Sequence, residues 1–121
     1  MITKTIDYQD GSRQLEGYLA YHETDQPKPA VLVAHDWSGR REFANKAAER
    51  IADMGYVGFA LDMYGKGIIG ADGDAEKNGA LMSPFAKDRA LLRRRINAAL
   101  DTVRQLPQVD ASRVAGMGYC F

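Results

Sequence analysis

Residues 30–39 read AVLVAHDWSG, a short unbroken apolar run followed at once by a polar loop that ends in glycine. An apolar run of this length without alternation is typical of a strand buried on both faces of a parallel sheet. Two further runs follow along the chain, VGFAL at 57–61 and RVAGMG at 113–118. We therefore expect three strands that belong to one parallel sheet.

The segment between the first two runs predicts a helix. Residues 43–54 (FANKAAERIADM) place apolar side chains at helical spacing, at Phe43, Ala47, Ile51 and Met54. Gly55 suits the C-terminal stop of this helix. Helices between parallel strands form right-handed crossovers, so the pattern predicts helices on both faces of the sheet.

A second helix is predicted from Pro84, capped by Ser83, to a stop at Pro107. Its buried stripe consists of Leu92, Ile96, Ala99, Leu100 and Val103. Steps of about 100° spread residues 93–95, three arginines, around the helix, which favours a solvated face over a basic patch. Residues 62–79 are rich in glycine and lack periodicity, so we expect a long loop of the kind that is often functional.

A β-hairpin is predicted before these elements. Residues 2–8 alternate β-branched or aromatic side chains with polar ones, Asp10-Gly11 is a turn signal, and residues 13–22 read as a second strand. The whole chain, residues 1–121, is therefore expected to form one α/β domain in which a hairpin precedes parallel strands.

Composition narrows the class of protein. The 121 residues include 45% apolar residues, 16 basic and 16 acidic ones, with a net charge of zero. A balanced charge argues against nucleic-acid and membrane-surface partners. A single cysteine fits a reducing compartment, and no apolar run resembles a signal peptide or a membrane span, so we expect a cytoplasmic protein. No metal or nucleotide motif is present, so no cofactor or metal is expected.

Chemistry is expected where the strands end, because sites in parallel sheets lie at the carboxyl ends of the strands. GYCF at 118–121 matches the first four positions of G-x-C-x-G, a nucleophile elbow with sulfur in place of oxygen. Cys120 is the candidate nucleophile, although a lone cysteine after a strand can also be a small core residue. The backbone N–H groups of Trp37 and Phe121 are the candidate oxyanion donors.

Three stretches, AVLVAHDWSG (30–39), GYVGFALDMYGKG (55–67) and RVAGMGYCF (113–121), resemble the dienelactone hydrolase family of the α/β-hydrolase superfamily. The resemblance implies that Cys120 attacks an ester or lactone carbonyl, with the oxyanion held by Trp37 and Phe121. Asp36 stands where the family usually has a glutamate that contacts the resting thiol; a loop-capping carboxylate is the alternative. No arginine is a secure counterpart of the family's substrate-carboxylate ligand, so a general esterase is as good an expectation as a dienelactone hydrolase.

Members of this family are roughly twice as long, so the chain is expected to be the N-terminal half, ending at the elbow. The family's catalytic acid and histidine would then follow Phe121, leaving the isolated chain inactive or very weakly active. His35 is either a makeshift base for Cys120 or a residue that packs or hydrogen-bonds within its loop, and His22 is expected on the surface.

The strand at 113–118 would lie at the edge of such a half-fold. An unpaired edge favours association, so the expected partners are the missing C-terminal half or a second copy in a homodimer, besides a small ester or lactone substrate. A non-catalytic, self-associating α/β module produced by truncation is the alternative function.

Overall fold

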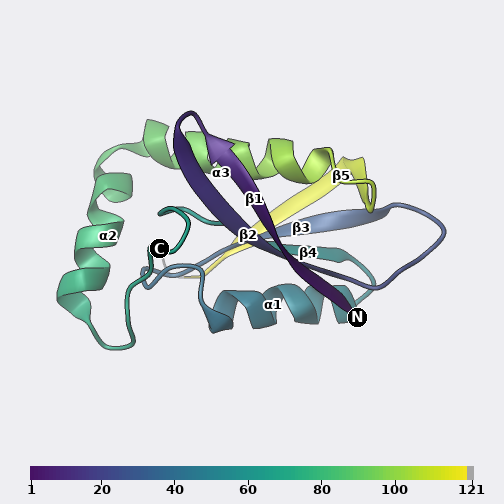
Figure 1. Cartoon of the computed structure of the whole chain (residues 1–121), viewed down its shortest axis with the longest axis horizontal. Helices are drawn as coiled ribbons and strands as arrows, with labels where there is room; N and C mark the ends of the chain where they lie inside the picture. Colours follow the sequence, from purple (N-terminus) through teal and green to yellow (C-terminus); the bar gives the residue numbers. More distant parts are fainter. Residues whose placement is uncertain (120–121) are drawn as a thin grey trace.

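The computed structural model describes residues 1–119. The elements are β1 (Ile2–Asp10), β2 (Arg13–Tyr21), β3 (Lys28–Ala34), α1 (Glu42–Asp53), β4 (Val57–Ala60), α2 (Ala75–Lys87), α3 (Arg89–Arg104) and β5 (Val109–Gly118). The strands form one sheet in the order β1-β2-β4-β3-β5 (Figure 1). β3 runs parallel to β4 and β5, and β2 is antiparallel to β1 and β4. The predicted hairpin and parallel strands are confirmed.

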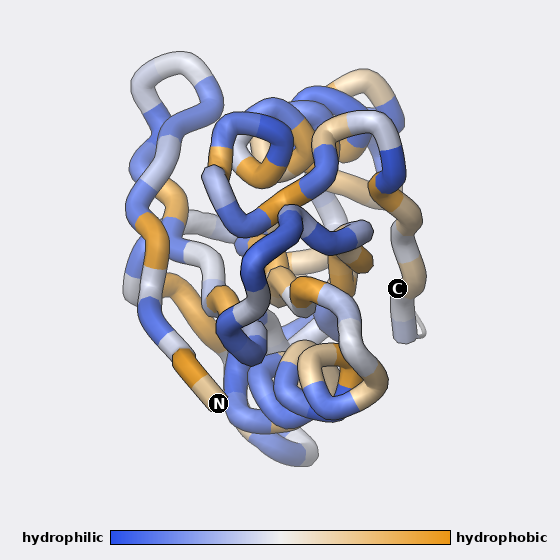
Figure 2. Tube along the Cα trace, turned by 90° about the vertical axis from the view of Figure 1, so that its right-hand side faces the viewer, coloured by the Kyte–Doolittle hydropathy of each residue, from blue (hydrophilic) through white to orange (hydrophobic). Residues whose placement is uncertain are grey.

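Helices cover both faces of the sheet, as predicted: α3 lies along one face and α1 along the other (Figure 1). β4 contributes side chains to both faces of the sheet. Phe59 packs in the cluster that includes the α3 residues Ala99 and Val103, whereas Ala60 packs against the alanines of α1. Hydrophobic segments accordingly lie toward the middle of the molecule and hydrophilic ones around it (Figure 2).

The buried face of α1 differs from the predicted one. Phe43 and Met54 are 55% and 65% exposed, and the helix instead buries Ala44, Ala47, Ala48, Ile51 and Ala52. The reason is close packing: a Cβ atom added to Gly58 of β4 would lie 2.1 Å from the carbonyl oxygen of Ala48. Only a face of small side chains brings a helix this near to a strand.

The region between β4 and α3 corrects two predictions. Helix α2 begins at Ala75, because Asp74 caps it by accepting from the N–H of Lys77 at 3.0 Å, so the loop after β4 is shorter than predicted. Pro84 lies inside α2 and Ser83 is not a cap. The predicted second helix corresponds to α3, which begins only after Asp88. The carboxylate of Asp88 accepts from the N–H of Leu91. The glycines near Asp74 favoured the prediction of a loop, so its role as the N-cap of α2 was not predicted.

Arg95 was predicted on a solvated face and is buried instead, with 7% exposure. Its Nε donates to Asp10 Oδ2 at 2.8 Å, its Nη1 donates to the carbonyl oxygen of Met63, and its guanidinium lies over the ring of Phe85. The charge is compensated by partners from the hairpin and from the loop after β4, which helical periodicity cannot reveal.

β5 is the open side of the sheet. It pairs with β3, no other strand within residues 1–119 pairs with it, and most of its residues are exposed. The expectation of an edge strand is met in the part of the chain that the structure describes. No helix in that same part is both long and apolar enough to cross a bilayer.

Candidate functional site

The loops that follow β3 and β4 meet at the carboxyl end of the sheet, where β5 also ends. The N–H of Leu61 donates to Val33 at 3.0 Å, and the N–H of Tyr119 donates to Ala34 at 3.3 Å. The hydroxyl of Tyr64 donates to the carbonyl oxygen of Trp37 at 2.8 Å. The chain therefore brings the three predicted loop regions to one place.

Trp37 lies in the loop after β3, half-buried. Burial raises the pKa of Tyr64, so its hydroxyl keeps the proton that it donates to the Trp37 carbonyl oxygen. Within residues 1–119 no acceptor engages the backbone N–H of Trp37. This N–H is therefore an available donor at the end of β3, as an oxyanion-hole group must be.

Asp36 supports the turn of this loop. Its Oδ1 accepts from the N–H of Ser38 at 2.9 Å and from the Ser38 hydroxyl at 2.6 Å. Gly39, which closes the turn at φ 98°, donates its N–H to the Asp36 carbonyl oxygen at 3.2 Å. These contacts are those of the loop-capping alternative. The contact with the thiol implied by the resemblance falls on Cys120, outside the described residues.

His35 is 2% exposed, and both of its ring nitrogens contact backbone groups. The N–H of Met63 donates to Nε2 at 3.1 Å, and Nδ1 lies 2.7 Å from the carbonyl oxygen of Asp36. Burial, only partly offset by the hydrogen bond to Asp36 and by nearby carboxylates, lowers the pKa of His35. Burial thus favours the neutral ring, and the engagement of both ring nitrogens by backbone groups favours the hydrogen-bonding interpretation over the makeshift base.

Sequence reasoning missed Asp62, which is 3% exposed and organises the loop after β4. Its Oδ1 accepts from the N–H groups of Tyr64 and Gly65, each at 3.0 Å, and its Oδ2 accepts from the N–H of Glu16. The backbone N–H of Asp62 in turn donates to the hydroxyl of Tyr8 at 3.1 Å. An aspartate directly after a buried strand and before a turn was the available signal.

The arginines beside the site have partners within the protein. Arg40 donates to the Glu16 carbonyl oxygen at 2.6 Å and to the Glu16 carboxylate at 2.7 Å. Arg41 pairs with Asp72 at 2.6 Å. Arg89, at the start of α3, is exposed. Because Arg40 and Arg41 hold carboxylates of the chain itself, neither is a free ligand for a substrate carboxylate.

The end of β5 leads directly into the candidate elbow. Gly118 pairs with Ala34, and a Cβ atom added to Gly118 would lie 3.3 Å from the Ala34 side chain, so this position favours glycine. The ring of Tyr119 meets that of Phe43 edge-on at 4.9 Å. Cys120 and Phe121, the predicted nucleophile and second oxyanion donor, lie outside the described residues.

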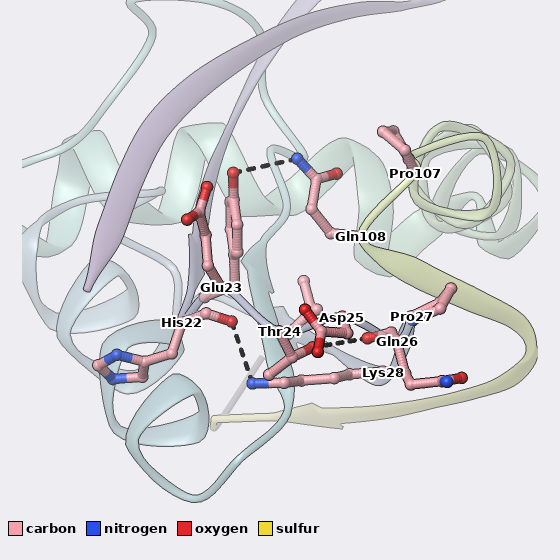
Figure 3. Close-up of a pocket in the computed structure, with 11 residues that line it drawn as sticks. His22, Glu23, Thr24, Asp25, Gln26, Pro27, Lys28, Pro107 and Gln108 are labelled. Atoms are coloured by element: carbon pink, nitrogen blue, oxygen red, sulfur yellow. Dashed lines mark hydrogen bonds between the residues drawn. The ribbon is translucent and has the colours of Figure 1, made fainter.

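A cavity of about 740 Å³ lies at the opposite end of the parallel strands (Figure 3). Residues 22–28 form much of its wall, together with Pro107 and Gln108. Lys28 donates there to the His22 carbonyl oxygen, and the His22 ring contacts Asp53 on the surface. None of the predicted site residues that the structure describes, His35, Asp36 and Trp37, lines this cavity, so it is separate from that part of the candidate site.

The family model described as "Dienelactone hydrolase family" matches residues 15–121. A candidate carboxymethylenebutenolidase from Aquifex aeolicus (strain VF5) is 28% identical, over 95% of this chain and 49% of its own. A dienelactone hydrolase-like promiscuous phosphotriesterase from metagenomic libraries has a TM-score of 0.91 and 33% identity, covering 99% of this chain and 49% of its own. The structure named m3DLH has the same TM-score and 37% identity, covering 99% and 50%. The chain spans about half the length of these relatives.

Proposed function

The chain belongs to the dienelactone hydrolase family, and we propose from this premise that it forms part of a hydrolase that cleaves carboxylic esters or lactones. The Cys120 thiolate adds to the carbonyl carbon, and the alcohol or enol oxygen leaves, which produces a thioester that water then hydrolyses. The N–H groups of Trp37 and Phe121 stabilise the negative oxygen of each tetrahedral intermediate. This chemistry requires a free thiol and therefore fits the cytoplasm.

The observation that carries the proposal is the hydrogen bond from the Tyr119 N–H to the Ala34 carbonyl oxygen, at 3.3 Å. It joins the residue before Cys120 to the residue before the loop that contains Trp37. The cysteine therefore follows a position at the carboxyl end of β3, and the loop that leaves this end carries the Trp37 N–H, which no acceptor within residues 1–119 engages. This arrangement supports the proposal, because a nucleophile and an oxyanion donor must lie close to each other.

Turnover by this chain alone should be slow, because its two histidines are poorly placed to act as a base. His35 is held by Met63 and Asp36, and His22 contacts Asp53 beside the cavity at the other end of the strands. General-base assistance is worth ~10²–10⁴-fold in rate. We propose that the isolated chain acylates but deacylates poorly.

The test is the reaction of the chain with 4-nitrophenyl acetate. We expect a burst of about one equivalent of 4-nitrophenolate per chain, followed by a much slower steady state. Mass spectrometry of a proteolytic digest should place the acetyl group on the peptide that contains Cys120. Acetylation confined to lysines or to the N-terminus would contradict the proposal.

We further propose that two copies of the chain associate in solution through β5. The strand presents a free edge within residues 1–119, and Met117 on it is 41% exposed. No lysine or proline within β5 protects the edge against pairing with another strand. A two-fold pairing of β5 with its copy would cover both edges at once. Should dimers form without any acylation, the non-catalytic, self-associating module would be the better description.

Light scattering coupled to size-exclusion chromatography at micromolar concentration tests this association. We expect the mass of two chains for the wild type and a shift toward one chain for Met117→Lys, with the dissociation constant raised by about tenfold or more. Met54→Lys is the matched control, because Met54 is also exposed but lies at the end of α1. A monomeric wild type, or equal effects of the two lysines, would contradict the proposal.

A further inference from the structure

We infer that His35 is a positioning residue that fixes the direction of the Trp37 backbone N–H through the peptide group that this N–H shares with Asp36. The inference rests on the proposed function for its catalytic consequence, since it assigns a role within the oxyanion hole. Its structural content, however, concerns only residues that the structure describes and can be measured without any substrate.

His35 contacts the carbonyl side of the peptide unit that joins Asp36 to Trp37. Nδ1 of His35 is 2.7 Å from the carbonyl oxygen of Asp36, which also accepts from the N–H of Gly39 at 3.2 Å. That oxygen and the N–H of Trp37 belong to the same peptide unit. A trans peptide is planar, with its C=O and N–H pointing in opposite directions. Holding the oxygen therefore directs the Trp37 N–H away from His35.

The hydrogen bond from Met63 shows which ring nitrogen of His35 carries the hydrogen. The N–H of Met63 can only donate, so Nε2 of His35, at 3.1 Å, is the acceptor. In a neutral imidazole the remaining nitrogen carries the hydrogen, so Nδ1 donates to Asp36. The backbone after β4 thus selects the tautomer of His35, and the tautomer makes the ring a donor to the peptide of the neighbouring loop.

Burial keeps the ring neutral. Burial and, to a smaller extent, the guanidinium of Arg40 disfavour the charged form, whereas the hydrogen bond to Asp36 and the carboxylates of Asp62 and Asp36 favour it. The net effect lowers the pKa of His35 below its ordinary value of 6.5. The Tyr64 ring covers it at 5.0 Å. A hydrogen bond to a carbonyl oxygen also polarises the peptide and strengthens its N–H as a donor.

Two variants and one control separate the two hydrogen bonds of the His35 ring, the one donated to Asp36 and the one accepted from Met63. His35→Asn can retain a donor near Asp36, whereas His35→Gln can retain an acceptor for Met63 and removes the donor to Asp36. Tyr64→Phe removes the hydrogen bond to the Trp37 carbonyl oxygen, which belongs to the next peptide unit. It therefore loosens the same loop without releasing the Asp36–Trp37 peptide.

The measurements are nitrogen-15 NMR of the His35 ring and the Trp37 amide, together with the burst rate constant for 4-nitrophenyl acetate. In the wild type we expect an Nδ1–H ring without an inflection near pH 6.5. In His35→Gln the Trp37 amide proton should move upfield, and the burst rate constant should fall by about 10- to 100-fold at unchanged half-saturation. His35→Asn should recover most of this loss, and Tyr64→Phe should reduce the burst rate constant clearly less than His35→Gln does.

The outcomes separate this inference from the proposed function. An Nε2–H ring, or a Trp37 amide that does not respond to His35→Gln, overturns the inference whatever the burst shows. A loss of burst rate as large in Tyr64→Phe as in His35→Gln also overturns it, because loop loosening alone then explains the effect. If the wild type shows no burst while the NMR results are as expected, the proposed esterase chemistry fails and the positioning of the Trp37 N–H stands.

Discussion

Replacing Cys120 with alanine is expected to abolish the burst with 4-nitrophenyl acetate and to slow specific acylation by at least ~10³-fold. Removal of the sulfur removes the atom that forms the thioester, and no other cysteine exists in the sequence to substitute for it. Stopped-flow absorbance of 4-nitrophenolate, with excess substrate and several protein concentrations, measures the loss directly.

Cys120→Ser is the informative companion variant. A serine hydroxyl needs a base to become a nucleophile, and the nitrogens of His35 are engaged by Met63 and Asp36. We therefore expect the serine variant to be nearly as inactive as the alanine variant. A serine variant with wild-type burst kinetics would reveal a competent base, and an alanine variant that retains the burst would show that another side chain is acylated.

Replacing Gly58 with alanine is expected to destabilise the fold by more than ~3 kcal/mol and to prevent α1 from docking on the sheet. The new methyl group would lie 2.1 Å from the carbonyl oxygen of Ala48 and 2.8 Å from its Cα atom. Both are backbone atoms of α1, so no side-chain rotation can relieve the overlap. The helix must move away from β4 instead, which opens the cluster of alanines that joins them.

Urea unfolding followed by circular dichroism measures this effect, and Gly79→Ala is the matched control. Gly79 lies inside α2, and a Cβ atom added there would meet no other atom within 4 Å. The same substitution should therefore stabilise the protein by about 0.5–1 kcal/mol, through helix propensity and reduced freedom of the unfolded chain. A Gly58→Ala variant as stable as the wild type would contradict the close helix–strand approach.

Local patterns in the sequence were sufficient for much of the fold. The Asp10-Gly11 signal predicted the hairpin, whose turn places Asp10 opposite Arg13. Unbroken apolar runs predicted β3 and β4 as buried strands, and the crossover pattern predicted helices on both faces. These signals are local because they depend on backbone geometry and side-chain periodicity within a few residues.

The errors had two origins: distant residues that compensate a local preference, and a local helix cap that was overlooked. Arg95 was predicted in solvent, yet Asp10 neutralises it from the hairpin and Met63 accepts from it after β4. Pro84 was read as a helix start because proline favours the first turn, but the carboxylate of Asp74 had already begun the helix. The partners of Arg95 lie far from it in the sequence, whereas Asp74 accepts from Lys77 only three residues away, so that cap was a local signal that went unrecognised.

By itself, the sequence determined the α/β order of elements, the family and the residues to consider for chemistry, because composition, periodicity and motif spacing are properties of the chain. Only the tertiary structure decided which group each of those residues meets. His35 receives the N–H of Met63, Asp62 receives that of Glu16, and Tyr119 reaches Ala34. Such pairings join strands and loops far apart in sequence. The packing that brings them together sets the geometry of each hydrogen bond.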